Sequence, residues 1–264
     1  MIEKIIEIVK NAGKLMLEKS FEIRQKDGYE NIVTSVDIQV QQYLISHLKK
    51  LVTDASFLCE ENTKSDAINA PYCWIIDPID GTTNFTRNLK QSAISVALKK
   101  ENEIILGIVY NPFSDDLYFA LKEKGSFHNN QAIKVSNRQF ADGLFCTAMS
   151  LYKKELAPQC LDVIAETYQR CNDIRRFGSC ALELCYLASG LCDLYFEMRV
   201  FPWDFAAAHL ILKEAGGVIS TLHRKEVYFD KPILLIAANN AENHEILSSI
   251  VSKHINQIPF KEEL

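Results

Sequence analysis

Residues 72–85 read YCWIIDPIDGTTNF, and the order of apolar and polar residues in this stretch predicts a buried strand followed by a tight turn. The apolar run at 72–76 has the length of a buried strand and leads directly into Asp77. A proline stiffens the link between Asp77 and Asp80, and Gly81 permits the turn. A strand end followed by a turn therefore places the two carboxylates on the same rim of a sheet.

The residues after the turn add a second kind of binding group. Residues 82–84 (TTN) can open a helix, so the backbone N–H groups of Gly81 and Thr82 point outward from a helix start and form an anion site. Hard divalent cations prefer oxygen ligands, and magnesium commonly shares the oxygens of a bound phosphate. The segment thus indicates magnesium-dependent phosphate chemistry, although Asp-Pro-x-Asp-Gly alone can also do no more than cap a turn.

Helical and strand patterns on both sides of this stretch predict a layered α+β or α/β fold, a sandwich of alternating helices and sheets. The expected helices are 1–19, 35–51, 156–171, 181–188, 205–215 and 242–253. The expected strands are 72–76, 93–98, 104–110, 117–121, 194–196, 218–219 and 233–237, and 25–31 is a polar loop. The pattern of expected helices and strands changes near residue 140. This change divides one compact catalytic unit into an N-terminal α+β metal-binding part (1–140) and a C-terminal α/β part (141–264).

Composition limits the classes of function. The 264 residues carry a net charge of -5, so the chain has no general electrostatic reason to bind nucleic acid. Charges interrupt the apolar residues at 1–10, which predicts an amphipathic helix and no signal peptide, and no apolar run approaches the roughly 18 residues of a membrane span. The eight cysteines include no CxxC pair, which favours reduced thiols. These features predict a cytoplasmic protein with no membrane contact.

Two further acidic positions stand beside structure-breaking or apolar residues. Glu61 belongs to the pair Glu60-Glu61, which by itself is typical of a solvated surface. Asp204 precedes an alanine-rich helix and by itself is typical of a helix N-cap. Other phosphatase chemistries lack their signatures, because the chain has no Asp-x-Asp pair, no cysteine with an arginine six positions later, and no Walker A, HExxH or Gly-x-Ser-x-Gly sequence.

Taken together, these segments resemble the inositol monophosphatase family. The block 77–85, DPIDGTTNF, closely resembles the family signature, and the resemblance extends in family order over nearly the whole chain. Its other blocks are NIVTSVD at 31–37, the pair Glu60-Glu61, RFGSCAL at 176–182, PWDFAA at 202–207 and EAGG at 214–217. The resemblance implies a homodimer of layered fold that hydrolyses a phosphate monoester, requires two or three Mg²⁺ ions and is sensitive to lithium.

The resemblance also assigns roles to matching positions. Metal ligands are expected at Glu61, Asp77, Asp80 and Asp204 and at the main-chain carbonyl of Ile79. Thr82 matches the threonine that orients the nucleophilic water, and Asp37 matches its acidic partner. Glu61 contributes to the ion that activates this water, and Gly81 and Thr82 are expected to contact the phosphate.

Substrate contacts are expected at a polyol pocket. Glu197 matches a family glutamate that hydrogen-bonds polyol hydroxyls, and Asp80 is a further expected contact. Gly178, Ser179 and Cys180 match the segment that lines the polyol pocket.

The chain departs from the family pattern where the substrate rim is built. Cys59 and Cys180 replace a common glycine and a common alanine, and 87–91 and 198–201 also differ.

The leading hypothesis is hydrolysis of myo-inositol 1-phosphate to inositol and phosphate by metal-activated water. The alternative is a sibling phosphatase acting on fructose 1,6-bisphosphate, NADP, histidinol phosphate or a 3′-phosphonucleotide. A further alternative is an additional role as a partner in RNA polymerase or ribosome-maturation complexes.

Overall fold

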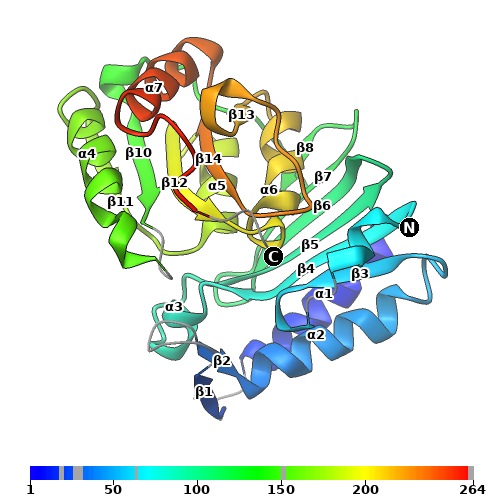
Figure 1. Cartoon of the computed structure of the whole chain (residues 1–264). Helices are drawn as coiled ribbons and strands as arrows, with labels where there is room; N and C mark the ends of the chain where they lie inside the picture. Colours follow the sequence, from blue (N-terminus) through cyan, green and yellow to red (C-terminus); the bar gives the residue numbers. More distant parts are fainter. Residues whose placement is uncertain (18–20, 26–31, 63–64, 150–152, 261–264) are drawn as a thin grey trace.

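The computed structural model describes residues 1–17, 21–25, 32–62, 65–149 and 153–260, and these residues form helices and sheets stacked in alternating layers (Figure 1). The helices are α1 (Ile2–Met16), α2 (Ser35–Leu48), α3 (Thr82–Thr86), α4 (Ala157–Tyr168), α5 (Cys180–Ala188), α6 (Pro202–Glu214) and α7 (Ala241–His254). The strands are β1 (Ile23–Gln25), β2 (Ile32–Thr34), β3 (Ser56–Cys59), β4 (Tyr72–Asp80), β5 (Ala93–Lys100), β6 (Glu103–Asn111), β7 (Asp116–Leu121), β8 (Ser126–His128), β9 (Gln131–Ile133), β10 (Leu144–Ala148), β11 (Asp173–Arg175), β12 (Leu194–Val200), β13 (Val218–Ser220) and β14 (Ile233–Ala238).

The strands form two main sheets. The larger sheet has the order β3-β4-β5-β6-β7-β8-β9, in which β3 and β4 are parallel and the other neighbours are antiparallel. The smaller sheet has the order β11-β10-β12-β14-β13 and combines parallel and antiparallel neighbours. Strands β1 and β2 form a separate antiparallel pair. The chain leaves the larger sheet after Ile133 and enters the smaller sheet at Leu144.

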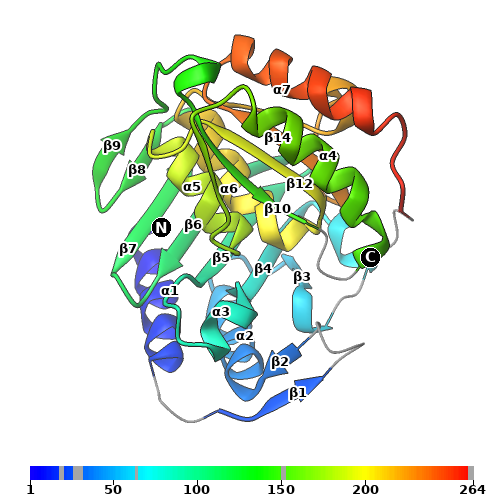
Figure 2. The ribbon, with the colours of Figure 1, turned by 90° about the vertical axis from the view of Figure 1, so that its left-hand side faces the viewer.

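Three apolar interfaces hold the layers together. Helices α1 and α2 cover one face of the larger sheet, α5 and α6 lie between the two sheets, and α4 and α7 cover the outer face of the smaller sheet (Figures 1 and 2). Fully buried side chains such as Trp74, Phe205 and Phe145 mark the three interfaces in turn. Because each sheet buries apolar residues on both faces, its central strands read as nearly continuous apolar runs.

Helix α6 packs unusually close to the larger sheet. A Cβ atom added to Gly107 in β6 would lie 2.4 Å from the backbone oxygen of Ala207 in α6. Ala206, Ala207 and Ala208 are fully buried in the same helix. Small residues on both elements therefore allow the helix that carries Asp204 to lie directly on the sheet that carries Asp77.

The predicted fold class is confirmed, and the predicted helices are present with ends that shift by a few residues. One local prediction is wrong: the strand does not end before Asp77 but continues as β4 to Asp80, and the turn follows. Its pairing with β5 shifts register between Asp77 and Asp80. Pro78, which has no N–H to donate, lies inside this irregularity, where a proline is tolerated in a strand.

The sequence did not predict the short strands β1, β2, β3, β8, β9, β10 and β11. They have three to five residues, too few to show a clear periodicity. Apart from Gln25, the predicted polar loop 25–31 lies outside the described residues. In the part of the chain that the structure describes, no helix is long and apolar enough to cross a membrane.

Candidate active site

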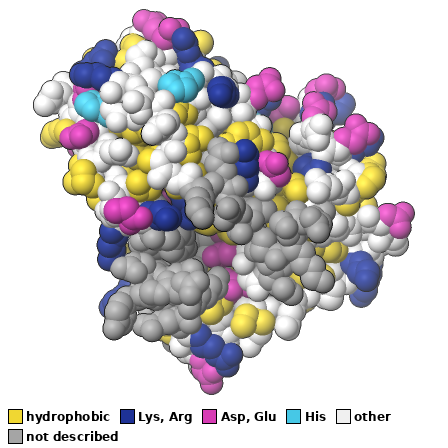
Figure 3. All heavy atoms as spheres, in the orientation of Figure 1, with side chains coloured by type: hydrophobic (Ala, Val, Ile, Leu, Met, Phe, Trp, Pro, Cys, Tyr) yellow, Lys and Arg dark blue, Asp and Glu magenta, His cyan; other side chains and the backbone are white. Residues whose placement is uncertain are grey.

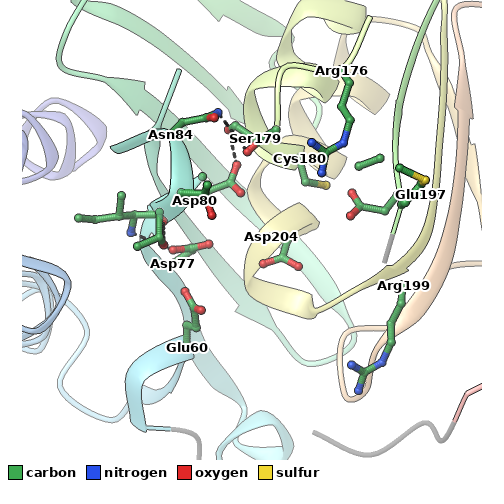
Figure 4. A pocket seen from close by; sticks show the side chains of 17 residues that line it. Glu60, Asp77, Asp80, Asn84, Arg176, Ser179, Cys180, Glu197, Arg199 and Asp204 are labelled. Carbon is green, nitrogen blue, oxygen red and sulfur yellow. Dashed lines mark hydrogen bonds between the residues drawn. The ribbon is translucent and has the colours of Figure 1, made fainter. Parts of the chain in front are cut away.

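A cavity of about 200 Å³ opens where the end of β4 meets the N-termini of α3, α5 and α6 and the strand β12 (Figure 4). It is lined by Glu60, Asp77, Ile79, Asp80, Gly81, Thr82, Thr83, Asn84, Ala148, Met149, Arg176, Gly178, Ser179, Cys180, Glu197, Arg199 and Asp204. In the space-filling view, acidic side chains are visible in a hollow near the middle of the face (Figure 3). Residues from both sheets line the cavity, so only the folded chain assembles it.

The end of β4 holds Asp77 and Asp80 in place. Both residues are buried, with 2% and 7% of their surface exposed. The Asp77 Oδ1 atom accepts a hydrogen bond of 2.9 Å from the backbone N–H of Ile79, which fixes the carboxylate across the irregularity in the strand. Local hydrogen bonding thus brings these two sequence-predicted residues together in one cavity, as the strand-and-turn pattern led us to expect.

A glycine makes the turn after Asp80 possible. Gly81 has φ +83°, and an added Cβ would lie 2.9 Å from the backbone oxygen of Gln91 and 3.0 Å from that of Gly178. Both the left-handed conformation and the lack of space therefore require glycine. The turn leads into α3, whose first residue, Thr82, lines the cavity together with Gly81.

Asp80 also binds the start of α5, a helix from the second half of the chain. Its Oδ2 atom accepts hydrogen bonds from the hydroxyl of Ser179 and, at 2.8 Å, from the backbone N–H of Ala181. Ser179 is the N-cap of α5, and its oxygen also accepts the N–H of Leu182. Gly178, Ser179 and Cys180 all line the cavity.

Asp204 enters the cavity from α6. It lies in the first turn of the helix, two residues after Pro202. Its Oδ2 atom accepts the backbone N–H of Phe201 at 2.8 Å. The carboxylate thus caps the helix from inside its first turn, and the interpretation of Asp204 as the N-cap residue itself is wrong because Phe201 holds that position.

Burial and mutual repulsion weaken the ionisation of these acids. Burial, and next the charge of Glu60, raises the pKa of Asp77 well above its usual range. Burial, and next the charge of Asp80, has the same effect on the pKa of Asp204. Burial raises the pKa of Asp80 to about 6, although the hydrogen bonds from Ser179 and Ala181 oppose the rise. A divalent cation would stabilise the charged forms of all these groups.

The structure places Glu60, not Glu61, in the cavity. Glu60 lines the cavity and points toward Asp77 (Figure 4), whereas Glu61 is not among the lining residues and its backbone N–H donates to Gln41 Oε1 at 3.2 Å. Both lie in a short 3₁₀ helix, residues 60–62, in which consecutive side chains point about 120° apart. Only one of the two glutamates can therefore face the cavity, and the expectation for Glu61 is corrected to its neighbour.

The predicted pair of Thr82 and Asp37 is not hydrogen-bonded in the structure, as far as the described residues go. The Thr82 hydroxyl donates to the backbone oxygen of Ile79 at 3.0 Å. Asp37 is fully buried at the start of α2, where its Oδ2 atom accepts the backbone N–H of Thr34 at 2.8 Å. Its Oδ1 atom has no hydrogen-bond partner among the described residues. Burial raises the pKa of Asp37 to about 7.

Glu197 and its surroundings form the other end of the cavity. Glu197 Oε2 accepts a hydrogen bond of 2.5 Å from the hydroxyl of Tyr195, and burial raises its pKa to about 7. Arg176 and Arg199 also line this end (Figure 4). Arg176 begins the family-like block 176–182 and Arg199 lies in the divergent stretch 198–201, but the sequence predicts no role for either side chain.

The oxygen donors of the cavity fit a hard divalent cation. Five acidic residues line the cavity, namely Glu60, Asp77, Asp80, Glu197 and Asp204, and Ile79 lines it as well. No three acidic, histidine or cysteine side chains are grouped tightly enough to hold one ion by themselves in the described ranges. Magnesium does not need such a group, because it commonly binds through one or two carboxylates and completes its shell with water and phosphate oxygens.

The layered fold with a carboxylate cavity between its sheets defines a protein of the sugar-phosphatase fold class. Residues 1–256 match the model of the inositol monophosphatase family, and the chain belongs to this family.

Individual relatives carry two kinds of name. The chain is 31% identical to the Nus factor SuhB of Pasteurella multocida over 256 residues, which make up 95% of each protein. It is 32% identical to the inositol-1-monophosphatase of Caulobacter vibrioides over 228 residues, 85% of this chain and 89% of that protein. The solved structure of the Thermotoga maritima IMPase is similar with a TM-score of 0.85 and 28% identity, and the match covers 97% of this chain and 98% of that one.

Proposed function

We propose that the protein is a magnesium-dependent phosphatase that hydrolyses a phosphate monoester of a small polyol- or sugar-like metabolite. The observation that carries this proposal is the meeting of Glu60, Asp77, Asp80 and Asp204 in one cavity with the glycine turn at Gly81. The name of the Caulobacter relative supports the same activity.

Different residues of the cavity would bind the metal ions and the substrate. Glu60, Asp77, Asp80, Asp204 and the Ile79 carbonyl would hold two or three magnesium ions. When bound, magnesium neutralises the charge of the phosphate and lowers the pKa of water so that it can attack phosphorus. The backbone at Gly81 and Thr82 would receive the phosphate, the Thr82 hydroxyl would orient the attacking water, and Glu197 would accept a hydrogen bond from a substrate hydroxyl.

Phosphate release tests the proposal. Inositol 1-phosphate is the reference substrate, and p-nitrophenyl phosphate serves as a substrate without polyol hydroxyls. We expect hydrolysis that requires Mg²⁺, stops with EDTA, returns when Mg²⁺ is restored and is inhibited by Li⁺. Undiminished hydrolysis in thoroughly chelated buffer would contradict the proposed role of the carboxylates. Light scattering should give a mass about twice the 30.0 kDa of one chain if the protein is the expected homodimer.

A second role is suggested by the name of the Pasteurella relative, Nus factor SuhB. We propose that the protein also binds RNA polymerase. Size-exclusion chromatography of the purified protein with purified RNA polymerase tests this role, and separate elution at micromolar concentrations would contradict it.

A further inference from the structure

Residues 176–179 form one wall of the cavity and are called the wall segment below. Arg176, Gly178 and Ser179 line the cavity, and Arg176 lies near Glu197 (Figure 4). The segment belongs to no helix or strand. Its backbone N–H and C=O groups therefore need partners other than a helix or a sheet, and those partners decide where the wall lies.

The N–H groups of the wall segment bind to Glu183. Glu183 lies in the first turn of α5 and is fully buried. Its Oε1 atom accepts the backbone N–H of Phe177 at 2.5 Å and that of Gly178 at 2.9 Å. One carboxyl oxygen thus fixes two consecutive peptide groups of the wall.

Asn84 holds the same segment from the other side through its C=O groups. The Asn84 Nδ2 atom donates to the backbone oxygen of Phe177 at 2.6 Å and to that of Gly178 at 3.3 Å (Figure 4). A Cβ atom added to Gly178, which has φ +80°, would lie 3.1 Å from the same nitrogen. The segment therefore lies between a side chain that accepts its N–H groups and one that donates to its carbonyls.

The interior of the protein does not need a carboxyl group at position 183. Its neighbours Leu182 and Leu184 are fully buried apolar residues of the layer between the two sheets. The Glu183 Oε2 atom is buried and has no hydrogen-bond partner among the described residues. Burying such a group costs free energy, so an apolar residue of similar size would serve the packing of α5 better. The bonds to the wall segment are what the carboxyl group provides.

The Glu183 side chain has a close neutral counterpart. Burial raises the pKa of Glu183 to about 8, although the two backbone N–H groups oppose the rise. The carboxyl group is therefore mostly protonated at pH 7. Glutamine has nearly the same shape, carries no charge and keeps an oxygen that can accept both N–H groups.

We propose that Glu183 is a positioning residue which, together with Asn84, holds the wall segment where it fits the part of the substrate that carries the hydroxyl groups. The inference rests on the proposed phosphatase activity and adds to it a residue that does not line the cavity. Glu183 acts through the backbone of the wall and does not touch the metal ligands. Asp80 keeps its own support, because the hydroxyl of Ser179 and the N–H of Ala181 bind it directly.

Glu183→Met and Glu183→Gln separate this role from a role in stability. Methionine keeps the size but loses the acceptor oxygen, whereas glutamine keeps that oxygen. For inositol 1-phosphate at saturating Mg²⁺, we expect KM to rise about 10-fold in Glu183→Met with little change in kcat, and to stay within about threefold in Glu183→Gln, since two hydrogen bonds of about 1 kcal/mol or less each are lost only in the former. For p-nitrophenyl phosphate, which lacks polyol hydroxyls, both variants should keep kcat/KM. The Tm of Glu183→Met should equal or exceed the native value, because an apolar residue replaces a buried carboxyl group.

Hydrogen exchange tests the contact without any substrate. The amides of Phe177 and Gly178 should exchange about 10-fold faster in Glu183→Met than in the native protein, and at the native rate in Glu183→Gln. Mass spectrometry of a peptide that covers residues 174–180 measures this change. Unchanged exchange in Glu183→Met would show that the wall is held by other contacts and would overturn the proposal.

Asp193→Leu is the matched control. Asp193 is also fully buried and accepts a backbone N–H, that of Leu144 at 2.8 Å, but it does not line the cavity. This variant should keep the native KM even if its Tm falls. A native KM in Glu183→Met would overturn the proposal, and so would equal losses on both substrates, because Glu183 would then act on the metal site. If the native protein hydrolyses neither substrate, the proposed phosphatase function is wrong, and hydrogen exchange still decides whether Glu183 holds the wall.

Discussion

The hydroxyl of Ser179 donates a hydrogen bond to the carboxylate of Asp80, a residue 99 positions earlier in the chain. This contact joins the start of α5 to the end of β4 and so connects the two halves of the chain inside the cavity. It also lowers the pKa of Asp80 against the opposing effect of burial.

Ser179→Ala removes this hydrogen bond and the side-chain cap of α5 at once. We expect a loss of about 1 kcal/mol in the free energy of unfolding, the usual cost of a lost N-cap. The pKa of Asp80 should rise further, so Mg²⁺-dependent activity should need a higher pH to reach half its maximum. Ser179→Thr, which keeps the hydroxyl, is the control. A pH profile identical in the native protein and in Ser179→Ala would contradict the assigned contact.

Glu60→Gln and Glu61→Gln form a matched pair that tests which glutamate serves the metal site. Only Glu60 lines the cavity. We expect Glu60→Gln to lower activity by about 100-fold or more and to raise the Mg²⁺ concentration needed, because outer-sphere changes alone already cost about 10- to 100-fold. Glu61→Gln should remain within a few-fold of the native protein. The reverse order of the two effects, measured in a Mg²⁺ titration, would restore Glu61 as the ligand.

Thr82→Ala tests the proposed orientation of the attacking water. A positioned proton-transfer group commonly contributes about 10² to 10⁴ in rate, whereas a simple structural hydroxyl contributes little. We expect kcat to fall by this factor and Thr82→Ser to recover most of it. If Thr82 and Asp37 act as one unit during the reaction, Thr82→Ala combined with Asp37→Asn should be little worse than either alone. Fully additive losses would show that they act separately, as their separate hydrogen bonds in this structure suggest.

The acids of the cavity give the stability of the metal-free protein an unusual pH dependence. Burial raises the pKa of Asp80 to about 6 and that of Glu197 to about 7, so the folded chain binds more protons than the unfolded chain between about pH 4 and 7. The free energy of unfolding should therefore fall as the pH rises through this window. Mg²⁺ should reverse the trend near pH 7 by binding the folded state. Urea unfolding with EDTA or Mg²⁺ measures both effects, and greater stability at pH 7 than at pH 5 in EDTA would contradict them.

Gly107→Ala tests the close contact between α6 and the larger sheet. The new methyl group would lie 2.4 Å from the Ala207 oxygen, so the helix must move. We expect a loss of about 1–3 kcal/mol in the free energy of unfolding, typical of overpacking, together with reduced activity because Asp204 moves with the helix. Gly125→Ala is the control, since nothing lies within 4 Å of its added methyl group and only the φ of +85° is strained. Native activity in Gly107→Ala would show that the helix tolerates the change.

How much of the site the sequence predicts depends on the range of the interaction. Asp77, Asp80 and Gly81 were predictable because a strand, a bulge and a turn place them within a few residues of one another. The Asp80–Ser179 contact was not, because it depends on how β4 and α5 pack. Whether Glu60 or Glu61 faces the cavity depends on how a single 3₁₀ turn is rotated. A turn of three residues is too short for the sequence pattern to show this rotation.

For the fold, too, features set by nearby residues were predictable and features set by long-range packing were not. Long amphipathic or apolar segments such as α1 and β6 were recognisable from their periodicity. Short strands such as β10 and β11 are defined mainly by the strands beside them, so their sequence carries little signal. The position of Arg199 was likewise not predictable, since it depends on the packing of its guanidinium against Phe201 and Phe260 at the edge of the cavity.

Helix α6 forms the middle layer of the molecule and also supplies Asp204, and this has a consequence for how the protein is made. During synthesis the chain up to β7 leaves the ribosome well before α6, so Asp77 and Asp80 exist for a time without their partner carboxylate. The charge of Asp204 adds to the repulsion between Asp77 and its neighbours only when α6 docks onto the larger sheet. A nascent chain that ends before Pro202 lacks Asp204 and therefore cannot complete the set of carboxylates in the cavity.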